Sequence, residues 1–247
     1  MIYTQKIEPS IYFQKVGIPL NEGITNLNKI LDMRVLIKIG GDCLNNGGYE
    51  SIGKNLADLY ALGIIPAIVH GGSSQIDKIM EEKGMQIIKV NGLRAVPDED
   101  TLDAVVEGLK EVNKGLVSTI NKYAGSKIAV GLTEEKIIYA KKIENAVNLG
   151  FVGEVTGIDT DKIDSYLKKR KIPVLWCIGY GKDGQQYNIN ADMVGENLAH
   201  EYNKYILLTS VGGYIQDGKI VPEMNLEQAK KHNASGGMSV KLDSIIR

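Results

Sequence analysis

Two lysines that lie close to glycine pairs are the residues of this sequence best suited to chemistry on an anion. Lys38 stands inside an apolar run and is followed by Gly40 and Gly41, and Lys241 comes shortly after a second glycine pair. A lysine in a buried strand is unfavourable unless an anion meets it, and glycines let that anion approach the backbone N–H groups. This combination suits a phosphate. A lysine that reaches out to water is the alternative for Lys38, and the segment alone favours neither.

Three further groups could bind the rest of a small anionic substrate. The segment 71–74, Gly-Gly-Ser-Ser, follows an apolar strand and precedes a helix, which makes a second anion site. Arg94 stands in a loop and suits a bidentate contact with a carboxylate, although a surface arginine is the plain alternative. Asn188, Asn190 and Asp192 alternate on an extended segment, so all three can point one way. A helix cap is the simpler role for Asp192.

Taken together, these groups predict phosphoryl transfer. They comprise two glycine loops, two lysines, one aspartate and one arginine, and no serine, cysteine or histidine stands in a pattern that would activate it. Phosphoryl transfer depends mainly on positioning the reactants and neutralising their charge. For the segment that ends in Lys241, a linker before a terminal helix is the alternative.

Two glycine motifs point elsewhere and are weak. Residues 48–54 match G-x-x-x-x-G-K, but Asn55 stands where a P-loop needs serine or threonine, and the match lies within an expected helix. Residues 179–184 match G-x-G-x-x-G after a strand, but no helix opens directly afterwards. We therefore expect neither nucleotide fingerprint, and we expect a glycine-rich hairpin at 179–184.

The elements that must position the site alternate between strands and helices. This alternation predicts an α/β fold with a parallel sheet that carries helices on its faces. Ser73 or Ser74 is expected to cap the second helix, and residues 133–155 are expected to form short strands and a side hairpin. Strands are expected at 35–39, 64–69, 86–90, 127–130, 172–178 and 205–209, and helices at 49–62, 75–83, 98–123, 161–169, 192–202 and 226–232.

The composition is that of an ordinary soluble globular protein. The 247 residues are 43% hydrophobic and 24% charged, and the formal net charge of -1 gives no support for a nucleic-acid surface. No apolar run is long enough to span a membrane, and the N-terminus has no basic region followed by an apolar core. Cys43 and Cys177 are far apart and lack a metal-type spacing, so we expect reduced thiols in a cytoplasmic protein.

In order and spacing, residues 34–241 resemble the amino-acid kinase family, and within it the members that phosphorylate N-acetyl-L-glutamate. The resemblance implies a three-layer αβα sandwich with an open, mainly parallel central sheet. It implies an N-terminal extension at 1–32 and one kinase domain at 33–247, divided into an acyl-amino-acid-binding half (about 33–180) and an ATP-binding half (about 181–247). The segments that carry the resemblance are Ile37–Gly41, Val69–Gly72, Gly92–Arg94, Val112–Lys114, Leu149–Val155, Tyr187–Asp192 and Gly236–Met238.

The resemblance implies transfer of the γ-phosphoryl group of MgATP to the side-chain carboxylate of N-acetyl-L-glutamate, in arginine biosynthesis. The product would be N-acetylglutamyl phosphate. Phosphate oxygens and water would hold Mg²⁺, so no protein metal ligand is expected. The expected partner is this small molecule rather than a nucleic acid or a membrane, and the expected assembly is a homodimer or a higher homo-oligomer.

Carried over by motif, the resemblance also implies roles for individual residues. Lys38 and Lys241 would stabilise charge on the transferring phosphoryl group and on ADP, and Asp192 would hold both lysines. The remaining substrate-binding residues would be Gly71, Gly72, Ser73, Arg94, Asn188 and Asn190, with Arg94 on the α-carboxylate. The remaining nucleotide-binding residues would be Gly40, Gly41, Thr209, Ser210, Gly212 and Gly237.

Three departures from the family pattern keep alternatives open. Ser73 replaces a third glycine, Ser210 replaces an aspartate on the nucleotide side, and only six residues follow Lys241, so the ATP-binding half is expected to be short. A kinase of a carrier-linked aminoadipate or glutamate is the nearest alternative, although residues 92–101 are compact and acidic. An amino-acid-binding sensor with weak catalysis is a second alternative. A nicotinamide-dependent oxidoreductase rests only on the match at 179–184.

Overall fold

The computed structural model describes residue 31, residues 33–144 and 148–210, and the short stretches 215–216, 219–221 and 227–228. The predicted extension at 1–32 and most of the helix predicted at 226–232 lie outside the described residues. The described elements are β1 (Val35–Ile39), η1 (Gly41–Leu44), α3 (Gly48–Ala61), β2 (Ala67–His70), α4 (Ser73–Glu82), β3 (Lys89–Val90), β4 (Leu93–Arg94), α5 (Glu99–Ala124), β5 (Ala129–Gly131), β6 (Ile138–Lys142), β7 (Gly153–Ile158), α6 (Thr160–Lys168), β8 (Ile172–Leu175), β9 (Ile178–Tyr180), β10 (Gln186–Asn188), α7 (Ala191–Ala199), β11 (Lys204–Leu208), β12 (Ile215–Gln216) and β13 (Lys219–Ile220).

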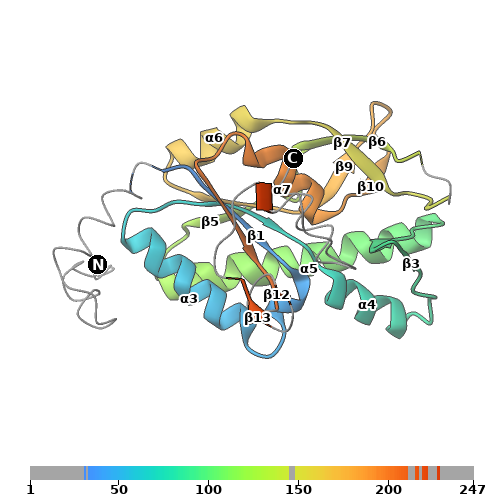
Figure 1. The fold of residues 1–247 in the computed structure, drawn as a ribbon, viewed down its shortest axis with the longest axis horizontal. Coiled ribbons are helices and arrows are strands. Elements are labelled where there is room, and N and C mark those ends of the chain that lie inside the picture. Colours follow the sequence, from blue (N-terminus) through green and yellow to red (C-terminus); the bar gives the residue numbers. More distant parts are fainter. Residues whose placement is uncertain are drawn as a thin grey trace.

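A five-stranded parallel sheet forms the centre of the molecule, in the order β11-β1-β2-β8-β5 (Figure 1). β1 lies between β11 and β2, and Ile37 stands opposite Ile206 on one side and Ile68 on the other. Because all five strands run the same way, the residues that follow β1 and β2 meet at one edge of the sheet. The predicted parallel sheet is confirmed.

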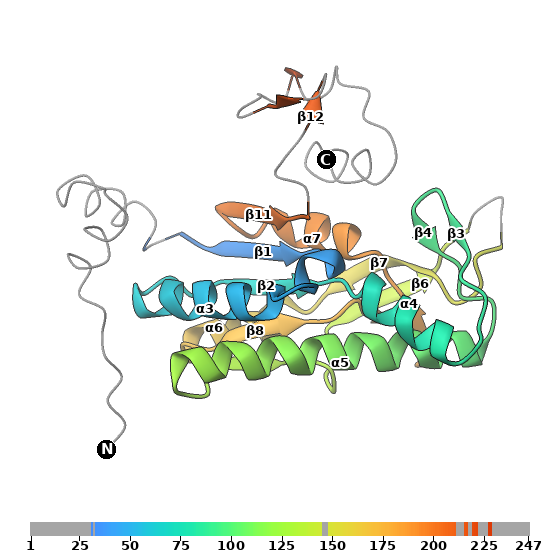
Figure 2. The ribbon, with the colours of Figure 1, turned by 90° about the horizontal axis from the view of Figure 1, so that it is seen from below.

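Helices cover both faces of this sheet, as Figure 2 shows. Ile37 and Ile39 pack with α3 and α5, whereas Leu36 packs on the opposite face with residues of α6 and α7. This alternation is the ordinary consequence of the two-residue period of a strand. It places Lys38 on the same face as Leu36, toward α7. The predicted three-layer αβα arrangement is confirmed.

The prediction of one strand at 172–178 is wrong in one respect. The segment forms two strands, and they belong to two different sheets. β8 belongs to the parallel sheet, and β9 belongs to a second sheet of order β10-β9-β6-β7. Trp176 packs with α4 and α5, whereas Cys177 packs in the cluster on the other face of the sheet. A continuous apolar run serves both environments, so the sequence pattern does not reveal the break.

Both glycine motifs occupy the places that the sequence predicted. The match at 48–54 lies within α3, so it forms no phosphate loop. The match at 179–184 lies on the antiparallel hairpin of β9 and β10, whose turn is closed by hydrogen bonds from Gly181 N–H to Gln185 O and from Gly184 N–H to Gly181 O. β6 and β7 form the expected side hairpin.

The helix cap predicted for α4 is wrong, and the alternative role of Asp192 as a helix cap is not observed either. Gly72 precedes α4 without any side-chain cap, because the Ser74 hydroxyl donates instead to Asp42 (2.6 Å). At α7 the cap is Asn190, whose Oδ1 accepts from the Asp192 N–H (2.8 Å), so Asp192 lies in the first turn. At α4 the difference follows from a partner that is distant in the sequence, and at α7 it follows from a competing polar residue two positions away.

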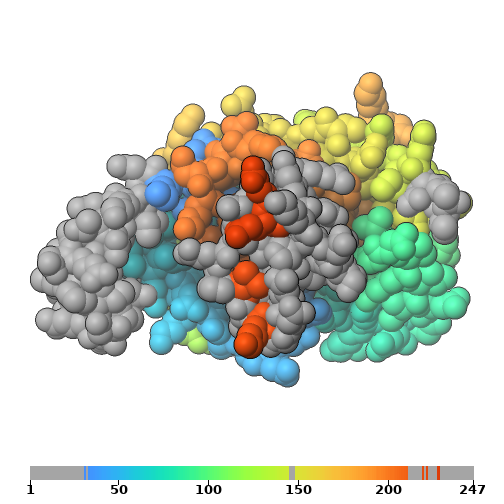
Figure 3. All heavy atoms as spheres, in the orientation of Figure 1, coloured from blue at the N-terminus to red at the C-terminus, as the bar shows by residue number. Residues whose placement is uncertain are grey.

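Segments that are far apart in the chain share one face of the molecule. In Figure 3, residues of α7 and β11 (orange) lie on the same face as residues from the start of the described chain (blue), consistent with the pairing of β11 with β1. Among the described residues, no helix combines the length and the apolar character needed to cross a membrane.

Candidate active site

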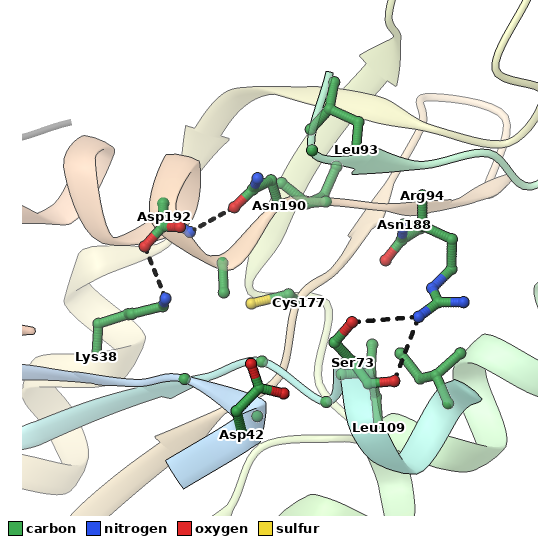
Figure 4. A pocket seen from close by; sticks show the side chains of 18 of the residues that line it. Lys38, Asp42, Ser73, Leu93, Arg94, Leu109, Cys177, Asn188, Asn190 and Asp192 are labelled. Atoms are coloured by element: carbon green, nitrogen blue, oxygen red, sulfur yellow. Dashed lines mark hydrogen bonds and ion pairs between the residues drawn. The ribbon is translucent and has the colours of Figure 1, made fainter. Parts of the chain in front are cut away.

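One pocket gathers every predicted site residue that the structure describes. It lies beyond the carboxyl ends of β1 and β2, between α4, the β3–β4 hairpin and the N-terminus of α7 (Figure 4). Lys241, Gly212 and Gly237 lie outside the described residues. The predicted residues that line the pocket are Lys38, Gly40, Gly41, Gly71, Gly72, Ser73, Arg94, Asn188, Asn190, Asp192, Thr209 and Ser210.

The lysine of β1 is paired with the aspartate of α7. The Lys38 ammonium lies 2.7 Å from an Asp192 carboxylate oxygen, and the two side chains are only 4% and 8% exposed. β1 carries Lys38 to this point because its neighbours Ile37 and Ile39 face the opposite helices. Asp192 reaches it because α7 begins one residue earlier. An ammonium makes three hydrogen bonds, and the described residues give this one a single carboxylate partner.

The two glycine loops offer fewer backbone N–H groups than predicted. Of the four glycine N–H groups, two are hydrogen-bonded within the sheet: Gly40 N–H donates to Leu208 O (3.0 Å) and Gly71 N–H donates to Ile39 O (2.9 Å). These two N–H groups are thus used within the protein in this structure, and contact of Gly40 and Gly71 with phosphate stays a prediction. The N–H groups of Gly41 and Gly72 have no acceptor among the described residues, so they are the two left for a ligand.

The loops also touch each other closely. A side-chain carbon at Gly41 would lie 2.7 Å from the backbone nitrogen of Ser73, which no larger residue would permit without displacement of backbone. The Ser74–Asp42 hydrogen bond joins the same two loops. The distance between the two potential anion-binding loops is thus set by direct contact.

Arg94 is almost fully buried and has several acceptors. Its guanidinium donates to the backbone and hydroxyl oxygens of Ser73 (both 3.3 Å), contacts the sulfur of Met80 (3.2 Å) and forms a short ion pair with Asp77. Asp77 also accepts from Lys89 (2.9 Å). Burial alone would raise the pKa of Asp77, but the hydrogen bonds from Lys89 and Arg94 outweigh burial and lower it. Arg94 thus keeps a fixed orientation at the pocket wall.

The opposite wall consists of the segment before α7. Asn188 ends β10, and its backbone N–H donates to Phe151 O (2.9 Å). The Asn190 amide caps α7 with its oxygen, and the described residues provide no partner for its amide nitrogen. Because both side chains line the pocket, their amide groups can bind polar atoms of a ligand.

Cys177 lines the pocket but is not a nucleophile at neutral pH. Burial, together with the Asp192 charge, raises the pKa of its thiol to about 12, although the nearby Lys38 ammonium opposes the shift. The thiol donates to His70 O (3.2 Å). Cys177 is therefore not an activated thiol, in agreement with chemistry by positioning and charge.

Some residues of the site were not foreseen. Asp42 lines the pocket and directly follows Gly41, so a polar residue beside the first glycine loop was the available signal. Asp77 does not line the pocket but pairs with Arg94, and its place one helical turn after Ser73 could have suggested that pair. Leu109 and Val152 come from elements whose apolar pattern gives no signal of a pocket.

Comparison with known proteins agrees with this fold. Residues 33–247 match the amino acid kinase family. The chain belongs to the amino acid kinase family. Relatives named acetylglutamate kinase are 36% identical in Kosmotoga olearia (92% of this chain, 83% of the relative) and 34% identical in Marinobacter nauticus (92% and 85%). The crystal structure of smu.665 from Streptococcus mutans UA159 is similar, with a TM-score of 0.73, 31% identity, and coverage of 85% of this chain and 87% of that chain.

Proposed function

We propose that this protein transfers the γ-phosphoryl group of MgATP to the side-chain carboxylate of N-acetyl-L-glutamate, a step of arginine biosynthesis. The observation that carries the proposal is one pocket that contains the Lys38 ammonium, two N–H groups with no acceptor among the described residues, and the Arg94 guanidinium. Two anionic reactants must meet there, and positive groups reduce their repulsion. Relatives named acetylglutamate kinase support the choice of acceptor.

At the phosphoryl end, Lys38 and the glycine loops would act on the transferring group. The ammonium would donate to its oxygens while Asp192 keeps the ammonium in place, as their 2.7 Å contact supports. The N–H groups of Gly41 and Gly72 would bind further oxygens. Charge would thus be stabilised where it builds up, without a covalent intermediate on the protein. A second lysine, Lys241, stays a prediction.

At the acceptor end, Arg94 would bind the α-carboxylate of N-acetyl-L-glutamate. Its buried, forked guanidinium suits a bidentate contact with a carboxylate. The amides of Asn188 and Asn190 would bind other polar atoms of the acceptor, and Ser73 would bound the pocket beside Arg94. This arrangement would leave the side-chain carboxylate toward Lys38.

ATP and Mg²⁺ fit the donors that the pocket offers. Phosphates need N–H and ammonium donors, and Gly41, Gly72 and Lys38 supply them. Within the described ranges, His, Cys, Asp and Glu side chains form no group of three or more that could hold a metal ion. We assign Mg²⁺ to phosphate oxygens and water. We assign Thr209, Ser210 and Gly40 of the first glycine loop to the nucleotide side of the pocket. Contacts of Gly212 and Gly237 with the nucleotide stay predictions.

The proposal also divides the domain into an acyl-amino-acid half (about 33–180) and an ATP half (about 181–247). Arg94 of the first half and Asp192 of the second line one pocket, which supports a site between them. A homodimer or higher homo-oligomer stays a prediction. Sedimentation equilibrium measures that assembly directly.

The test is a coupled assay of ADP release with MgATP. N-acetylglutamate, glutamate, aspartate and no acceptor are compared, and hydroxylamine traps an acyl phosphate as a hydroxamate. We expect ADP and hydroxamate with N-acetylglutamate alone. A folded protein that releases ADP with none of these acceptors, or equally with all of them, would contradict the proposal.

A further inference from the structure

His70 is a fully buried titratable residue for which the proposed function has no role. It ends β2 directly before the second glycine loop and is 0% exposed, behind the pocket rather than in its lining. Both ring nitrogens have partners: Nδ1 lies 3.1 Å from Gly71 O, and Nε2 lies 3.0 Å from the amide nitrogen of Asn113 on α5. Which nitrogen carries the proton decides what the ring does to Gly71.

The Asn113 amide determines the tautomer. Its amide nitrogen also donates to Val174 O (2.9 Å), and a carbonyl oxygen only accepts, so this end of the side chain must be the NH₂ group. Its two hydrogens are then used by Val174 O and by His70 Nε2. Nε2 must therefore accept, and Nδ1 carries the hydrogen and donates to Gly71 O. Burial lowers the pKa of His70 to about 4, so the ring is neutral at pH 7.

The orientation of the Asn113 amide is itself restricted by packing. Asn113 is 3% exposed, and a side-chain carbon at Gly131 on β5 would lie 2.1 Å from Asn113 Oδ1. Only a glycine fits there. The amide oxygen thus lies against β5 while the amide nitrogen faces β8 and β2. Asn113 and His70 are both buried, so water does not compete for the hydrogen bond between them.

The hydrogen bond from His70 acts on the peptide group between Gly71 and Gly72. In a trans peptide the C=O and N–H groups point in opposite directions, so a restrained Gly71 C=O also restrains the Gly72 N–H. Gly72 lines the pocket, has φ -155° and ψ 25°, and belongs to neither a strand nor a helix. The N–H of Gly71 on the preceding peptide is held by Ile39 O. Secondary structure restrains that peptide, and His70 restrains the next one.

We propose that His70, kept in the Nδ1–H form by Asn113, is a positioning residue that holds the Gly72 N–H toward the pocket as a donor to the transferring phosphoryl group. The inference rests on the proposed function for the identity of that group. In the other tautomer, Nδ1 would present a lone pair to Gly71 O and would repel it. The peptide would then be free to turn a carbonyl toward an anionic ligand.

The first test reads the tautomer without any turnover. Long-range ¹H–¹⁵N spectra of the unaltered protein distinguish a protonated from an unprotonated ring nitrogen, and the chain has only three histidines. The signals that disappear in His70→Asn belong to His70. We expect a neutral ring with the proton on Nδ1. A ring protonated on Nε2 would overturn the inference and would leave the proposed kinase activity untouched.

The second test separates positioning from stability. His70→Asn keeps an amide donor near the place of Nδ1, whereas His70→Leu removes the donor. We expect His70→Leu to lower kcat about tenfold or more. The loss should be smaller than the roughly 10²-fold loss that follows removal of a transition-state donor, because the Gly72 N–H remains but is no longer held in place. His70→Asn should keep most of kcat, and the KM for N-acetylglutamate should change little in both.

Asn113 and Asn121 provide a matched pair on one helix. The Asn121 side chain also anchors a strand with two hydrogen bonds, to Ala129 O (3.1 Å) and from Ala129 N–H (2.8 Å), but it does not contact His70. We expect Asn113→Leu and Asn121→Leu both to lower the free energy of unfolding, and only Asn113→Leu to lower kcat and to change the His70 tautomer. Equal kcat values in the two folded variants, or wild-type kcat in folded His70→Leu, would overturn the inference.

Discussion

Two buried cations stand at opposite ends of the pocket, each paired with a carboxylate, and the two pairs differ in how their charges are used. Lys38 and Asp192 are both sealed from solvent, and Asp192 is the only described partner of the ammonium. Arg94 is equally buried, but Asp77 is 26% exposed and shares its charge with Lys89, while Ser73 and Met80 take further guanidinium hydrogens. One cation is held by a single anion, and the other is held by a network.

The difference indicates what each end can do. A lysine with one partner keeps N–H donors for a group whose charge changes during the reaction. An arginine fixed by several acceptors recognises a carboxylate whose charge does not change, because its geometry is set before binding. Loss of the first should therefore affect kcat, and loss of the second should affect KM.

The largest effect is expected for Lys38→Met. We expect kcat to fall roughly 10²-fold or more, because a donor to the transition state is lost. The free energy of unfolding should fall by about 3 kcal/mol, because Asp192 is left buried without its cation. ADP-release kinetics and urea unfolding measure the two quantities.

Two controls sharpen this prediction. Lys38→Met combined with Asp192→Asn should regain stability but not activity. Lys83→Met removes a pair of similar length (2.6 Å) whose side chains are 42% and 48% exposed, so it should change stability little and leave kcat unchanged. Wild-type turnover in Lys38→Met would contradict the role assigned to this lysine.

The second effect is expected for Arg94→Lys. An ammonium does not reproduce the forked contact, so the KM for N-acetylglutamate should rise about tenfold or more while kcat changes less. Lys89→Met is the matched control, because Lys89 also pairs with Asp77 but does not line the pocket. If both variants raised KM equally, Arg94 would act only through Asp77.

A smaller effect is expected for Asp77→Asn, and it depends on pH. The pKa of Asp77 lies below its ordinary value of 3.8, so its contribution to stability is present above pH 3.8 and is lost as the pH falls through the folded value. The difference in free energy of unfolding between the unaltered protein and Asp77→Asn should thus shrink in acid. Urea unfolding over a pH series measures it, and a difference that stays constant would refute the assigned ion pair.

The smallest effect is expected for Tyr205→Phe, beside the Lys38–Asp192 pair. Burial and the Asp192 charge raise the pKa of Tyr205, and its hydroxyl is buried with no hydrogen-bond partner among the described residues. Tyr205→Phe should therefore be neutral or stabilise the protein by up to about 1 kcal/mol, because an unsatisfied polar group is removed. Thermal unfolding measures this change, and a clear loss of stability would show that the hydroxyl is bonded.

The alternation of elements was predictable because its signals are local. Apolar runs ended by glycines predicted β1, β2 and their loops, and Asp98 marked the start of α5, where its carboxylate accepts from Thr101 N–H (2.8 Å). The break between β8 and β9 at Trp176 and Cys177 was not predictable, because two different cores bury one continuous apolar run.

The sequence by itself determined the residue types at the site and their order along the chain. It placed Lys38 in a strand, glycines after two strands and Asp192 at the start of a helix, because strand period, glycine freedom and helix capping act over a few residues.

Only the tertiary structure decided which of these groups remain for a ligand. Gly40 N–H is used by Leu208 O and Gly71 N–H by Ile39 O, whereas the N–H groups of Gly41 and Gly72 have no acceptor in the part of the chain that the structure describes. The partner of each N–H is a neighbouring strand or side chain that is distant in the sequence, and that neighbour exists only after the sheet and its helices have packed together.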